Sequence, residues 1–95
     1  MPNFNFYNVT FARAKNSDQL LIRGEIQNRS VKSYAAVAIR IICFNKSIPL
    51  TNTVIVVNGV PAGQTKLFDK RVEDLTYDRA MQTMTRHEIF IESAY

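Results

Sequence analysis

Residues 20–28 read LLIRGEIQN and residues 34–44 read YAAVAIRIICF, and these two stretches decide the fold of this chain. Side chains of a strand point to opposite faces in turn, so apolar residues at alternating positions predict strands with a buried face. The polar residues between the two stretches predict a short connection. Both faces of the second stretch are mostly apolar, which indicates a central strand that is partly covered on both sides.

The same alternation extends outward from this pair. We expect further strands at about residues 4–14, 51–57, 64–72 and 85–94, separated by polar or Pro/Gly turns. The phase of the first strand changes near Phe6-Tyr7, which predicts either a bulge there or a crossing of the strand between sheets. Gly24, inside a strand, predicts that an aromatic ring lies over it. Tyr77, Met81 and Met84 have helical spacing and predict a short helix before the last strand.

Composition supports one globular domain spanning residues 1–95. The chain is 46% hydrophobic and 21% charged, which is typical of a folded domain. No apolar stretch approaches the ~20 residues of a membrane span. The N-terminus shows no signal segment, so the chain is either cytoplasmic or one domain of a longer exported or anchored protein. We predict an all-β, Ig-like antiparallel β-sandwich of six to seven strands with one short helical turn before the last strand.

Candidate chemical groups are few. Cys43 is the single cysteine and His87 the single histidine, and both lie in strand patterns. A Cys/His dyad would need them to meet in an accessible cleft, whereas strand-face residues of this kind more often belong to a core. One His and one Cys cannot supply the three or four ligands of a typical zinc site. We therefore expect no catalytic residue, no metal and no cofactor.

The net charge of +4 allows a second hypothesis, binding of nucleic acid or another anionic polymer. The twelve basic residues are scattered, and no run exceeds two, so a solvated basic surface is the simpler interpretation. Stacking on single-stranded nucleic acid needs exposed aromatic side chains. Tyr34 and Tyr95 are the best candidates for such exposure.

A set of strand and turn residues resembles the FxLYD family of bacterial, envelope-associated Ig-like domains. The matching positions are Ile22, Gly24, Ile26, Asn28, Tyr34, Val37, Ile39, Ile41, Phe44, Pro61, Gly63 and Phe68. The chain departs from the naming motif, because Ile42-Cys43-Phe44-Asn45 stands where the family has Leu-Tyr-Asp. The resemblance implies a non-catalytic module and an extracytoplasmic location in the cell envelope.

We therefore predict a non-enzymatic module that acts as a spacer or binds another protein or a sibling domain. Self-association into a homo-oligomer is a further alternative. If an edge strand captures a partner, the uncharged β-branched stretch around residues 51–57 is the candidate, since an edge offers unpaired backbone groups. The candidate residues are Thr51, Thr53, Val54, Ile55, Val56 and Val57.

Overall fold

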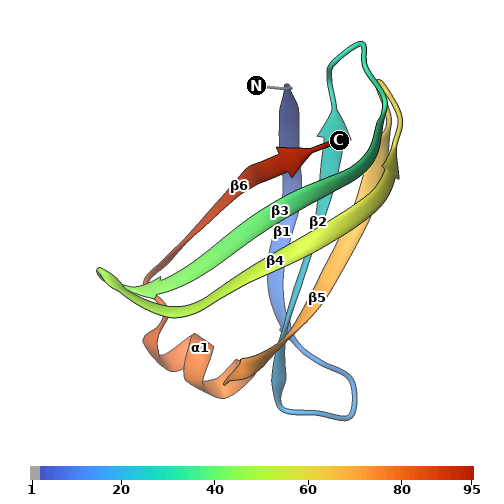
Figure 1. Cartoon of the computed structure of the whole chain (residues 1–95). Helices are drawn as coiled ribbons and strands as arrows, with labels where there is room; N and C mark the ends of the chain where they lie inside the picture. The colour runs from blue at the N-terminus through green and yellow to red at the C-terminus, as the bar shows by residue number, and fades with distance from the viewer. Residues whose placement is uncertain (1–2) are drawn as a thin grey trace.

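The computed structural model describes residues 3–95 as six strands and one helix. In chain order the elements are β1 (Phe4–Arg13), β2 (Gln19–Asn28), β3 (Tyr34–Asn45), β4 (Ile48–Val60), β5 (Thr65–Thr76), α1 (Tyr77–Thr83) and β6 (Arg86–Ala94). The strands form two three-stranded antiparallel sheets with the orders β1-β2-β5 and β4-β3-β6. Figure 1 shows the two sheets as separate layers. The prediction of an all-β sandwich is confirmed.

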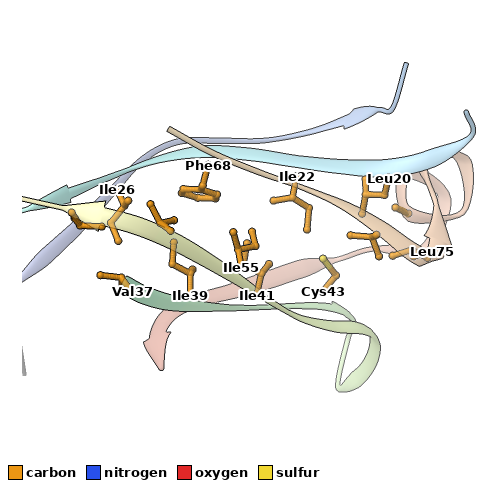
Figure 2. Close-up of a cluster of buried hydrophobic side chains, with 14 of the residues drawn as sticks. Leu20, Ile22, Ile26, Val37, Ile39, Ile41, Cys43, Ile55, Phe68 and Leu75 are labelled. Carbon is orange, nitrogen blue, oxygen red and sulfur yellow. The ribbon is translucent and has the colours of Figure 1, made fainter. Parts of the chain in front are cut away.

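The core lies between the sheets. Side chains from β2 and β5 face side chains from β3 and β4 across the interior (Figure 2). Ile22 and Ile26 from one sheet and Val37, Ile39 and Ile41 from the other are completely buried. Burying one such side chain stabilises the fold by about 1.5–3 kcal/mol. The predicted alternation therefore places the apolar residues of both central strands in one interior.

The absence of a side chain at Gly24 makes room for an aromatic ring, as predicted. Gly24 lies opposite Phe68 in the pairing of β2 with β5. A Cβ atom built on Gly24 would lie 2.5 Å from Cζ of Phe68. Phe68 is buried and meets Phe6 edge-on at a centroid distance of 6.4 Å. This contact joins all three strands of the first sheet.

The bulge of β1 lies slightly later than predicted. The register with β2 shifts between Tyr7 and Thr10, and Asn8 has a φ of 53°. Asparagine is among the few non-glycine residues that adopt this left-handed conformation readily. The extra residue changes which side chains of β1 face the core, so Phe6 packs there before the bulge and Phe11 after it. The prediction of an irregularity near Phe6-Tyr7 is therefore confirmed, and the irregularity is a bulge.

The predicted helix is confirmed, although β5 extends further than residues 64–72 and ends at Thr76. The Thr76 side chain caps α1 by accepting a hydrogen bond from the backbone N–H of Arg79 at 3.2 Å. A register shift between Gln19 and Leu20 of β2 lets both Val72 and Leu75 face the core although they are three residues apart. The helix lies at one end of the molecule, where Ala80 is buried (Figure 1).

Candidate functional site

β4, which contains the candidate stretch at residues 51–57, forms one edge of the sheet β4-β3-β6. It is longer than predicted, because β3 and β4 form a hairpin that pairs Asn45 with Ile48. Its other long side faces β5 of the opposite sheet. Within residues 3–95, no backbone hydrogen bond joins β4 to β5. The outer edge of β4 is therefore unpaired.

The direction of the β4 backbone follows from hydrogen bonds made by β3. The backbone N–H and C=O of Ala36 both bond to Tyr95, and the C=O of Phe44 accepts from the N–H of Thr85. Even-numbered residues of β3 thus face β6, and odd-numbered residues face β4. Val37 pairs with Val57, and this register continues unbroken to Cys43 and Thr51. Odd-numbered residues of β4 consequently bond to β3, and the even-numbered residues 52–58 direct their N–H and C=O groups outward.

The six predicted residues of β4 divide between the two faces of the sheet. Ile55 and Val57 are buried in the core, and Thr51 is buried with its hydroxyl donating to Oδ1 of Asp74 at 2.8 Å. Thr53 is partly buried in the same inward phase. Val54 and Val56 point to the outer face, and Val56 is 56% exposed. Only two of the six side chains are therefore placed to contact a partner, while the others hold the strand in position.

Open grooves follow the boundary between β4 and β5. One groove of about 270 Å³ is lined by residues 55–58 of β4 and 66–69 of β5. A second, of about 390 Å³, is lined by residues 51–53 and 70–74. Leu67, which is 78% exposed, lies in the wall of the first groove together with Val56. The sequence pattern did not identify Leu67, because a single apolar residue on an outward strand position carries no distinctive signal.

The unpaired edges of the two sheets differ in their protection. Charged residues, bulges and prolines normally keep edge strands from pairing with other chains. β1 has its bulge at Asn8, β5 carries six charged residues from Lys66 to Asp74, and β6 carries Arg86, Glu88 and Glu92 together with a register shift against β3. In β4, Pro49 stands near the start, but residues 51–58 contain no charge, proline or glycine. β4 is thus the edge best suited to pair with another strand, because no charged side chain at residues 51–58 restricts which strand can bind there.

Cys43 and His87 lie opposite each other on β3 and β6. The Cys43 thiol is completely buried, and the His87 ring instead packs against Phe11 at a centroid distance of 5.0 Å. Burial, together with the nearby carboxylate of Asp74, raises the pKa of Cys43 from 9.0 to about 11. A nucleophilic thiol needs access and a lowered pKa, so this environment is the opposite of an activated one.

The basic and aromatic side chains of residues 3–95 differ in their surroundings. Three basic side chains are engaged in ion pairs, Arg13 with Asp78, Arg40 with Glu92 and Arg86 with Glu88. Tyr95 is 68% exposed as predicted, but the prediction for Tyr34 was wrong. Tyr34 is buried because it packs against Phe4 at a centroid distance of 5.7 Å. The hypothesis of binding to an anionic polymer therefore stays a prediction.

Two further features bear on ligands and membranes. In the part of the chain that the structure describes, no three His, Cys, Asp or Glu residues are grouped to hold a metal ion. The only helix found between residues 3 and 95, α1, is far too short to cross a bilayer. The β4 edge and the adjoining grooves therefore remain the candidate site.

Comparison of the chain with protein-family models, with curated proteins and with solved structures finds no match. The resemblance to FxLYD domains accordingly stays a prediction from the residues quoted above.

Proposed function

We propose that this chain is a non-enzymatic β-sandwich module that binds a protein partner by adding an extended segment of that partner to β4. The observation that carries the proposal is the unprotected edge at residues 51–58, where alternate residues direct backbone donors and acceptors outward. In strand addition, main-chain hydrogen bonds supply affinity and alternate side chains supply specificity. The buried thiol, with its raised pKa, supports a binding role over a catalytic one.

The side chains around β4 indicate what such a segment would contact. Side chains on its outer face would lie beside Val54 and Val56. Those on its inner face would meet the wall formed by Lys66 and Leu67 of β5. Covering Val56 and Leu67 would remove two exposed apolar side chains from water. An extended segment with apolar residues on both faces fits this edge.

The resemblance to FxLYD domains supports the same class of role. It implies a spacer or interaction domain of an envelope-associated bacterial protein, placed beside sibling domains or an anchor. Strand addition at β4 would give such a module a way to hold a neighbouring chain. We therefore include the extracytoplasmic location in the proposal.

Substitution of Val56 by proline tests the proposed edge. The N–H of Val56 points away from β3, so proline there removes an outward donor and leaves the β3–β4 hydrogen bonds intact. Peptides selected from a displayed random library on the native domain should bind Val56→Pro at least about tenfold more weakly. Val56→Thr, which keeps the donor and the β-branched shape, should retain binding.

The location of binding is read directly from amide hydrogen exchange. A bound peptide should slow exchange at Asn52, Val54 and Val56, whose N–H groups point outward. Equal binding to a folded Val56→Pro variant would contradict the proposal, and so would protection confined to another strand. Failure of any peptide to enrich on the native domain would also count against it.

A further inference from the structure

β6 is the opposite edge of the same sheet, and the sandwich is less covered on that side. Core-facing side chains of β4 and β5, such as Ile55 and Phe68, are buried. In contrast, Phe11 of β1 and Ile89 and Ile91 of β6 are only partly buried. β1 and β6 are both edge strands, so no further strand of residues 3–95 covers this seam.

The backbone of β6 also offers unpaired groups. Even-numbered residues of β3 face β6, and Arg40 pairs with Phe90 while Ile42 pairs with Glu88. Phe90 and Glu88 therefore bond to β3, whereas His87, Ile89 and Ile91 direct their N–H and C=O groups away from the sheet. Three outward-facing residues are enough to form a ladder with another strand.

We propose that the occupant of this edge is β6 of a second copy of the chain, paired antiparallel about a twofold axis at Ile89. The arrangement joins the two β4-β3-β6 sheets into one continuous six-stranded sheet. It pairs the outward backbone groups of Ile89 with those of Ile89 in the other copy, and those of His87 with Ile91. The partly buried Ile89 and Ile91 of each copy then cover one another.

Charge complementarity selects both the occupant and the register. With the axis at Ile89, Glu88 lies opposite Phe90 of the second copy, and Arg86 lies at the level of Glu92, the extra residue at the register shift between β6 and β3. Shifting the axis to Glu88 sets this carboxylate against itself, and shifting it to Phe90 sets Glu88 against Glu92. Like charges directly opposite each other destabilise a sheet, and opposite charges stabilise it. Axes nearer either end of β6 pair fewer residues.

The ion pairs within one copy leave capacity for these contacts. Arg86 donates from Nη1 to Glu88 at 2.6 Å and from Nε to the backbone oxygen of Lys46 at 3.1 Å. Glu92 accepts from Nε of Arg40 through Oε1 at 2.6 Å. Within residues 3–95, Nη2 of Arg86 and Oε2 of Glu92 have no hydrogen-bond partner. One donor and one acceptor therefore remain for the second copy.

Two substitutions of Phe90 test the register by sedimentation equilibrium. Phe90 is 41% exposed on the outer face, and both variants remove the same ring. Phe90→Lys places a lysine opposite Glu88 of the second copy, whereas Phe90→Glu places a second carboxylate opposite Glu88. Each of these contacts occurs twice in the dimer because of the twofold axis. The dimer dissociation constant of Phe90→Glu should exceed that of Phe90→Lys by about tenfold or more. Unfolding midpoints confirm that both variants are folded.

A monomeric native chain from about 1 µM to about 1 mM overturns the proposal. A dimer weakened more by Phe90→Lys than by Phe90→Glu overturns the register. Such a result means that residue 90 faces a positive charge, which is the case when Arg86 of the second copy lies opposite it. A dimer affected equally by the two charges overturns it as well. None of these results alters peptide binding at β4, so the two proposals fail separately.

Oxidative cross-linking gives an independent test of the axis. Directly opposed residues of a hydrogen-bonded antiparallel pair have Cα atoms about 5.5 Å apart, within the range of a disulfide. Ile89→Cys should therefore form a covalent dimer under mild oxidation, while the buried Cys43 does not compete. Val56→Cys is the matched variant on the other edge. Cross-linking through Val56→Cys but not Ile89→Cys would assign the contact to β4 and overturn the proposal.

Discussion

Replacing Gly24 by alanine should destabilise the domain through one contact. The new Cβ atom would lie 2.5 Å from Cζ of Phe68 and 3.0 and 3.1 Å from its two Cε atoms. Phe68 is buried against Phe6, so its ring cannot simply move into solvent. Overpacking of a core costs about 1–3 kcal/mol, and alanine in place of glycine in a strand offsets roughly 0.5–1 kcal/mol of that loss.

The net expectation for Gly24→Ala is a loss of about 1–2 kcal/mol in the free energy of unfolding, measured by urea titration. For a domain of this size, the loss lowers Tm by about 5–15 °C. Phe68→Leu removes the crowded ring atoms, so adding Gly24→Ala to Phe68→Leu should be neutral or stabilising. The double-mutant cycle should therefore give a coupling free energy of at least about 1 kcal/mol.

Gly63→Ala provides the control for this cycle. Gly63 has a φ of 76° and no atom within 4 Å of a built Cβ, so alanine there is strained by its backbone and not by crowding. Its effect should add independently to that of Phe68→Leu. A Gly24→Ala variant as stable as the native chain would refute the reasoning. So would a loss that stays undiminished in the Phe68→Leu background.

Two further predictions concern buried polar groups. Asn28→Ala should lower the free energy of unfolding, measured by urea titration, by about 2–3 kcal/mol. The buried amide of Asn28 donates to the backbone oxygens of Lys32 at 2.8 Å and Val60 at 3.1 Å, and in the variant no water replaces this donor. A change below about 0.5 kcal/mol would contradict this reasoning. Cys43 should react with a disulfide reagent at pH 8 only after unfolding, because burial raises the pKa of its thiol to about 11. Rapid labelling of the folded chain would contradict the buried position of this thiol. The same shift makes the unfolded thiol ionise first, so stability should fall between pH 9 and pH 11, and the Cys43→Ala variant should lack that component.

Several local features were predictable because neighbouring residues determine them. Alternation identified β2 and β3, and the two apolar faces of β3 placed it at the centre of its sheet. Gly24 in a strand predicted an aromatic neighbour, and Phe68 fills that position. The spacing of Tyr77 and Met81 predicted α1. Each of these inferences depends on side-chain direction or backbone preference within about ten residues.

Other features depended on contacts between residues distant in the chain. Tyr34 stands at the boundary between a polar connection and an apolar strand in the sequence, and it is buried because β1 brings Phe4 against it. The extension of β5 to Thr76 includes residues 73–75, which have no partner in β2 because Gln19 pairs with Thr76 and Leu20 with Val72, and only the pairing of the two strands reveals this irregularity. The adjacency of Cys43 and His87 likewise results from pairing between strands more than 40 residues apart.

The alternation of apolar residues by itself determined that this chain forms strands with one buried face, because side-chain direction along a strand is a local geometric property. Only the tertiary structure decided that β2 pairs with β5, that β3 lies between β4 and β6, and which backbone groups the two outer edges of that sheet leave unpaired. These choices depend on packing two complete sheets against each other, and many strand orders are compatible with the same alternation. The edges, and with them both proposed binding surfaces, exist only once that packing is complete.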